Sequence, residues 1–165
     1  AISLSLAAML FYIWIRFEWQ FSIGAILALV HDVIITLGFF SLLSYEINLS
    51  IVAAVLTIVG YSMNDTVVIF DRIRENLKKY SKISTSDICD TSINETLSRT
   101  LITSITTLLA LLSIYIFGGP ILIGFSFAMI IGVIIGTYSS IFVATPILNY
   151  TKVTQETILK EENKN

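Results

Sequence analysis

Four long apolar stretches dominate this chain and restrict what it can fold into. They cover about residues 21–44, 49–70, 97–117 and 121–148, and a shorter stretch covers 2–15. A helix needs about 20 apolar residues to cross a bilayer core of about 30 Å, so each of the four is long enough. Hydrophobic residues make up 55% of the 165 residues and charged residues 13%, which exceeds what a water-soluble domain needs. We therefore expect an all-α membrane protein with five transmembrane helices.

The basic residues predict how these helices are oriented. With the five stretches numbered in chain order from 2–15 to 121–148, Arg16 lies between the first and second. Between the third and fourth lie Arg72, Arg74, Lys78, Lys79, Lys82 and Arg99, and after the fifth come Lys152, Lys160 and Lys164. By the positive-inside rule, residues 71–96 form a cytoplasmic loop, 151–165 a polar cytoplasmic tail, and residue 1 lies outside. Within the loop we expect the third helix to continue through residues 71–80 and, after a break at 81–85, a second helix with Ser84 to Ser86 as candidate caps. Because no signal-peptide pattern opens the chain, we expect a further helix and an exported region upstream.

Composition and motifs argue against several classes of function. The net charge of −2 includes no basic field of the kind that nucleic acid requires. The single Cys89 excludes an internal disulfide and a cysteine-rich metal site, and the lone His31 cannot form a zinc-protease motif. Intramembrane aspartyl proteases carry YD and GxGD motifs, whereas this chain has HD and ND. We therefore expect no enzyme activity, metal or cofactor.

Four ionisable side chains fall within or beside the apolar stretches and are candidates for function: His31, Asp32, Asp65 and Arg99. An unpaired charge in the middle of a bilayer costs at least about 2.5–3.5 kcal/mol. We therefore expect these groups to face the helix bundle and to have partners there.

Two polar stripes with a spacing of four residues indicate which groups meet. One comprises Thr57, Tyr61 and Asp65, with Asn64 beside it, and the other comprises Arg99, Thr103 and Thr107. Antiparallel packing would bring Asp65 within reach of Arg99, directly or through water, which would suit a carboxylate that takes up and releases a proton. Other interpretations stay open: Arg99 reaches only to the membrane surface, Asp65 is a buried packing group, and Asp32 with His31 forms either a proton relay or a structural hydrogen bond.

Small residues at intervals of four predict close helix packing in residues 121–148. The row comprises Gly124, Ala128, Gly132, Gly136 and Ser140, and Gly60 thins the helix of residues 49–70 in the same way. Each step of four residues turns such a row by about 40° around the helix axis, so the row cannot face one parallel neighbour along its whole length. We therefore expect either a neighbouring helix that crosses obliquely or two neighbouring helices that share the row.

Three segments resemble the membrane half of the SecF family of bacterial protein-export subunits. They are HDVIITLGFF (31–40), VGYSMNDTVVIFDRIRENL (59–77) and INETLSRTLITSITTLLALLSIYIFGG (93–119). The resemblance covers about residues 1–150. The sister family SecD is less similar, because it has DAN where this chain has SMND and lacks the HD pair.

The resemblance implies a fold and a function. SecF proteins are similar to the RND (resistance-nodulation-division) transporters, with six helices and a large exported domain between the first two; this chain would supply the last five. They pair with SecD beside the SecYEG channel in the bacterial plasma (inner) membrane and use the proton-motive force to help preproteins cross the lipid bilayer. Asp65 and Arg99 match the family's intramembrane aspartate and arginine, with Thr103, His31 and Asp32 nearby. Two alternatives are half of a related exporter of small molecules or lipids and a purely structural membrane scaffold.

Overall fold

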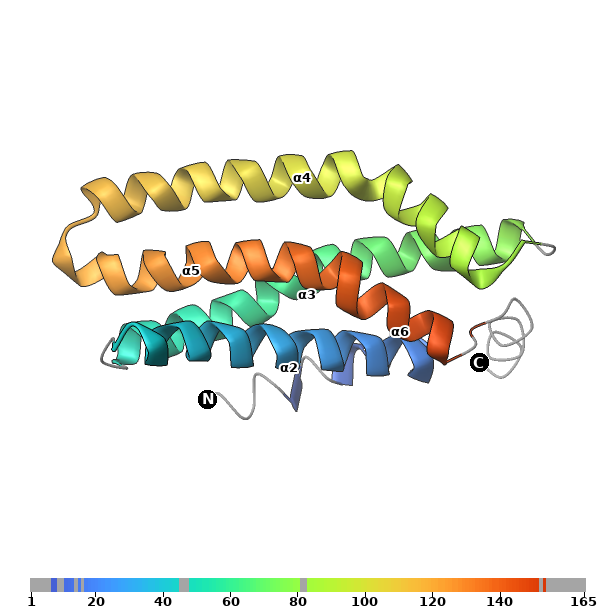
Figure 1. Ribbon diagram of the computed structural model, residues 1–165, viewed down its shortest axis with the longest axis horizontal. Helices are drawn as coiled ribbons and strands as arrows, with labels where there is room; N and C mark the ends of the chain where they lie inside the picture. Colours follow the sequence, from blue (N-terminus) through green and yellow to red (C-terminus); the bar gives the residue numbers. More distant parts are fainter. Residues whose placement is uncertain are drawn as a thin grey trace.

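The computed structural model describes residues 7–8, 11–13, 15, 17–44, 48–80, 83–151 and 153, and this part of the chain is all helical. Its elements are α2 (Trp19–Leu42), α3 (Leu49–Lys79), α4 (Thr85–Phe117), α5 (Pro120–Ser139), the π-helical turn η1 (Ser140–Ala144) and α6 (Thr145–Tyr150). They form an elongated bundle (Figure 1). By length and composition, α2, α3, α4 and the continuous helix from α5 to α6 are each able to span a membrane. The expected helix 2–15 and tail 151–165 lie mostly outside the described residues.

Local sequence signals explain where the helices begin. The Asn48 side chain accepts a hydrogen bond of 3.0 Å from the Ile51 amide, and the Ser84 hydroxyl accepts one of 3.2 Å from the Asp87 amide. Both are N-cap contacts that satisfy free amides of the first turn. Gly119 has φ 77°, a left-handed conformation that glycine adopts without strain, and it lets Pro120 start α5 directly after α4.

Two features of the helices differ from the expected ranges. The expected loop 71–96 is mostly helical, because α3 continues to Lys79 and α4 begins at Thr85. The sequence predicts both helical pieces but not that the second runs unbroken into the transmembrane stretch; no glycine or proline stands between residues 85 and 117 to end it. The stretch 121–148 is also not one regular α-helix, because η1 interrupts it.

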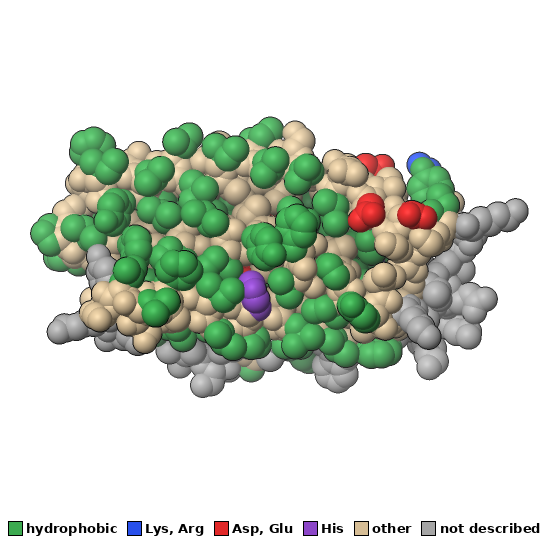
Figure 2. Space-filling view, in the orientation of Figure 1, with side chains coloured by type: hydrophobic (Ala, Val, Ile, Leu, Met, Phe, Trp, Pro, Cys, Tyr) green, Lys and Arg blue, Asp and Glu red, His purple; other side chains and the backbone are tan. Residues whose placement is uncertain are grey.

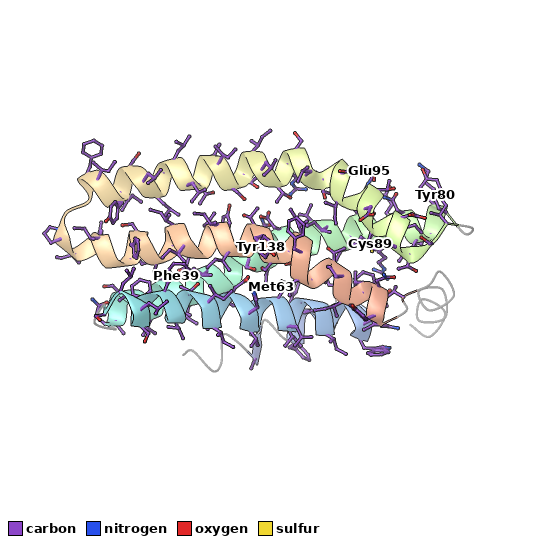
Figure 3. All side chains as sticks on the ribbon, viewed as in Figure 1. Phe39, Met63, Tyr80, Cys89, Glu95 and Tyr138 are labelled. Atoms are coloured by element: carbon purple, nitrogen blue, oxygen red, sulfur yellow. The ribbon has the colours of Figure 1, made fainter. Side chains whose placement is uncertain are left out.

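The core consists of two apolar clusters, one toward each end of the bundle. One includes Phe21 and Phe70, whose rings pack edge to face with their centroids 5.2 Å apart. The other includes Ile58 and Val133. Helix α5 contacts α2, α3 and α4. The apolar side chains on every helix can be followed in Figure 3. Between the two clusters lies a layer of polar side chains.

Candidate functional site

The polar layer is the main candidate for a functional site. Its buried members come from four helices: Asp32, Thr36, Ser62, Asp65, Thr66, Thr100, Ser104, Ser139 and Ser140. A bilayer supplies no water to such groups, so each needs a partner inside the protein. Asp32 and Asp65 divide the layer into two halves with different surroundings.

Asp32 is buried, with 1% of the residue exposed, and links three helices. Its Oδ2 accepts hydrogen bonds from the hydroxyls of Ser62 on α3 (2.5 Å) and Ser139 on α5 (2.8 Å). His31 Nδ1 lies 3.0 Å from Oδ1. The imidazole is 30% exposed, and Figure 2 shows the histidine (purple) at the surface, midway along the bundle. Both oxygens of Asp32 therefore have partners, and the carboxylate holds α2, α3 and α5 together.

The π-helical turn extends this half of the layer. The hydroxyl oxygens of Thr66 and Ser140 lie 2.9 Å apart, which connects α3 to the first residue of η1. Thr145 donates to the Ser140 carbonyl at 3.0 Å. Short π-helical segments occur often at functional sites. Sequence analysis missed Ser62, Thr66 and Ser139, although the adjacent serines 139 and 140 inside an apolar stretch are a signal that points to them.

Asp65 occupies the other half of the layer, where its carboxylate has fewer hydrogen-bond partners among the described residues than that of Asp32. The residue is 3% exposed, and the Ser104 side chain and the charge of Arg99 on α4 both act on its carboxylate. Within the described part of the chain, Oδ2 has no hydrogen-bond partner, and the same holds for the buried Thr100 hydroxyl. Ser104 also lies 2.7 Å from the Thr137 hydroxyl, which connects α4 to α5. Asp65 is therefore a buried carboxylate with one free oxygen.

The two polar stripes predicted from the sequence meet at Tyr61. Its hydroxyl lies 3.3 Å from both the Thr103 carbonyl and the Thr107 hydroxyl. Arg99 is exposed, and within the described part of the chain it forms no ion pair with Asp65. Asn64 is also exposed, so it lies away from the carboxylate of its neighbour.

The small residues of α5 pack against α3. A Cβ added to Gly132 would lie 2.3 Å from Ile58 Cγ1, and one added to Gly136 would lie 3.0 Å from Ser62 Cβ. Ala128 and Ser140 are fully buried, whereas a Cβ at Gly124 would meet Ile51 only at 3.9 Å. The row can follow one neighbour because α3 crosses obliquely behind α5 (Figure 1).

Gly60 does not make the packing contact expected of it. It is exposed, and a Cβ there would meet nothing within 4 Å among the described residues. Its side of α3 instead lines a shallow hollow with Asn64, Met63, Val67 and Tyr12. The spacing of small residues does not reveal which face of a helix has a neighbour.

Comparison with known proteins agrees with this architecture. The family model described as "Protein export membrane protein SecD/SecF, C-terminal" matches residues 1–154. The chain is 57% identical over 148 residues to protein translocase subunit SecF of Rickettsia bellii, covering 90% of this chain and 49% of that protein. It is 52% identical over 153 residues to the SecF subunit of Cereibacter sphaeroides, covering 93% and 47%.

The structural comparison gives the same relationship. A crystal structure of SecDF from Thermus, described as a translocon-associated membrane protein, superimposes with a TM-score of 0.86 and 46% identity over 89% of this chain and 20% of that one. A SecDF structure in a super-membrane-facing form gives 0.84 and 43%, over 97% and 22%. The chain spans about half the length of the SecF relatives that it matches. It belongs to the SecD/SecF family of protein-export membrane proteins.

Proposed function

We propose that this chain is the membrane part of a SecF-type accessory subunit of bacterial protein export. It works with SecD beside the SecYEG channel and couples proton flow to the passage of preproteins, which an exported domain outside this chain contacts. The named relatives are translocase subunits, and the Thermus protein is translocon-associated. Nothing in the polar layer favours the alternative of a small-molecule or lipid exporter. The basic residues orient the protein in the inner membrane with residue 1 outside and the C-terminus in the cytoplasm.

One observation carries the proton-coupling part of the proposal: the two buried carboxylates differ in how fully they are bonded. Both oxygens of Asp32 have partners, whereas Oδ2 of Asp65 has none among the residues that the structure describes. This oxygen can therefore accept a proton, or a hydrogen bond from water, without breaking an existing bond. Asp65 exchanges the proton, and Asp32, with His31 beside it, holds the helices in register around it.

Arg99 supplies the force that turns protonation into movement. Its guanidinium stays charged at every physiological pH, so it attracts Asp65 when the carboxylate is ionised and loses this attraction when Asp65 takes up a proton. Helix α4, which carries Arg99 and Thr103, is the least buried of the four long helices and is therefore the freest to move. Moving one charge across 100 mV contributes about 2.3 kcal/mol, enough to shift an equilibrium between two helix arrangements.

The exposed polar groups on α3 and α4 fit a second membrane subunit. Asn64 and Arg99 are exposed within helices long and apolar enough to span the membrane. Facing lipid would cost each of them free energy, so a partner bundle is expected to cover them. SecD, itself a member of this family, would supply polar groups at the same depth.

The test is preprotein translocation into inverted vesicles, with and without a proton gradient. In the full-length subunit, Asp65→Asn is expected to abolish the stimulation by the gradient while ATP-driven translocation continues, and Asp65→Glu is expected to keep part of it. Ser113→Ala, at an exposed position of α4 where the hydroxyl donates to the Leu109 carbonyl of its own helix, is the control and should retain the stimulation. Undiminished stimulation in Asp65→Asn would refute the proposed role.

A further inference from the structure

A groove outside the polar layer runs along the surface between α4 and the end of α5. Its larger part has a volume of about 620 Å³. A smaller part of about 210 Å³ continues beside η1 and α6. Asp90, Ile93, Ile141 and Phe142 line both parts, so the two form one continuous groove.

The walls of the larger part are bulky and apolar. Leu101 is 43% exposed, Ile134 54%, Tyr138 55% and Phe142 61%. The rings of Tyr138 and Phe142 stack at 4.9 Å and form one side of the groove, and Tyr138 is labelled in Figure 3. The Thr137 hydroxyl donates to the Val133 carbonyl at 2.8 Å, so it offers no free donor to a ligand. The groove therefore presents a hydrocarbon surface.

The lining is polar and acidic where the two parts of the groove meet. Asp90 is the only ionisable group that both parts share, and Ser86, Asn94 and Asn149 lie near it. Among the residues that the structure describes, no lysine or arginine lines the groove, and Asp90 forms no ion pair. Figure 2 shows acidic side chains gathered at the right-hand end of this face and basic ones only at its upper right edge.

The length of the larger part of the groove matches one leaflet of a bilayer. From Asp90 to Leu101 the helix rises about 16 Å, at about 1.5 Å per residue, which is close to half of a hydrocarbon core of about 30 Å. A partner helix would need to cross the whole core. Membrane helices also approach one another through small residues, and large side chains form these walls. Length and shape both favour a single acyl chain over a helix.

We propose that this groove binds a phospholipid whose headgroup carries a primary ammonium, as in phosphatidylethanolamine. One acyl chain lies along Leu101, Ile134 and Tyr138, and the ammonium group donates to the Asp90 carboxylate at the membrane surface. Charge selects the headgroup, because an anionic lipid would place its phosphate beside Asp90, where no lysine or arginine lines the groove among the residues that the structure describes. The proposal depends on the membrane location of the chain and is independent of proton coupling.

The first test measures which lipid the purified full-length subunit retains, by native mass spectrometry after exchange into micelles with phosphatidylethanolamine, phosphatidylcholine or phosphatidylglycerol. Retention of phosphatidylethanolamine is expected to exceed that of phosphatidylglycerol about tenfold, the factor typical of one hydrogen bond to a charged group. Asp90→Asn should remove this preference, and Asp90→Glu should keep it. Ile134→Trp, on α5, should fill the groove and displace the lipid, whereas Ile105→Trp, at an exposed position of α4 that does not line the groove, should not. Equal retention of the lipids, or a preference unchanged in Asp90→Asn, would overturn the proposal.

A second test identifies the occupant in native membranes. A photoactivatable phenylalanine analogue placed at Phe142 of the full-length subunit is expected to form adducts of the mass of phosphatidylethanolamine. Cross-linking to another polypeptide instead would show that a protein covers the groove and would refute the lipid assignment. Adducts with every lipid in proportion to its abundance would show unselective contact and would refute the role of Asp90.

Discussion

Replacing Gly132 by alanine should destabilise the bundle through one identifiable collision. The added Cβ would lie 2.3 Å from Cγ1, 2.4 Å from Cδ1 and 2.8 Å from Cγ2 of Ile58. Ile58 is 1% exposed and branched at Cβ, so it has little freedom to rotate away within a helix. Overpacking of this kind costs about 1–3 kcal/mol, and alanine recovers about 0.5–1 kcal/mol of helix propensity. We expect a net loss of about 1–2 kcal/mol.

The assay is reversible unfolding of the full-length subunit in mixed micelles, followed by circular dichroism. Ile58→Val in the Gly132→Ala background should recover part of the loss, because it removes the Cδ1 methyl from the collision. Gly60→Ala is the matched control: no described residue lies within 4 Å of the added Cβ, so stability should stay the same or rise slightly. An equal loss in both glycine variants would refute the argument, since the effect would then not come from α3–α5 contact.

Two further predictions concern hydrogen bonds. Ser139→Ala leaves Asp32 with one hydrogen-bond donor fewer and should lower the free energy of unfolding by about 1–3 kcal/mol in the same assay. Ser126→Ala, which loses only bonds within its own helix, should lower it less. Equal losses would contradict the proposal that Asp32 connects the helices. Outside the membrane-spanning stretches, the hydrogen bond from Arg72 holds the pKa of Glu95 below its usual 4.5. This contribution to stability is complete above pH 4.5 and disappears as the pH falls through the lowered value. The stability difference between Arg72→Gln and the unsubstituted protein, measured from pH 7 downward, should therefore shrink in acid, and a constant difference would refute this.

The parts of the fold that depend on local sequence could be predicted. Apolar stretches long enough for a bilayer predicted the transmembrane helices, and Ser84 was among the candidate caps for the helix that begins at Thr85. The sequence did not predict that this helix runs unbroken across residues 85–117, because its composition changes from polar to apolar after the first third. Gly60 was misassigned because spacing places a residue on a helix without saying what lies opposite.

The polar layer shows where sequence reasoning is limited. Asp32 and Asp65 stand out in the sequence because placing a carboxylate inside the bilayer costs free energy. The partner that distinguishes them, Ser139, lies 107 positions from Asp32 and faces it only because α5 packs against α2 and α3. The π-helical turn lies just before Pro146, which has no backbone N–H to donate to the preceding turn, so this proline was an unused signal of the irregularity. Contacts between residues on different helices can be identified only from the folded structure.

The central claim is that Asp65 exchanges a proton inside the membrane. Difference infrared spectroscopy of the full-length subunit in lipid measures this directly, through the carbonyl band of a protonated carboxyl group. The account predicts a band that appears and disappears reversibly with pH, that is absent in Asp65→Asn and that persists in Asp32→Asn. A band that survives in Asp65→Asn and is lost in Asp32→Asn would contradict it.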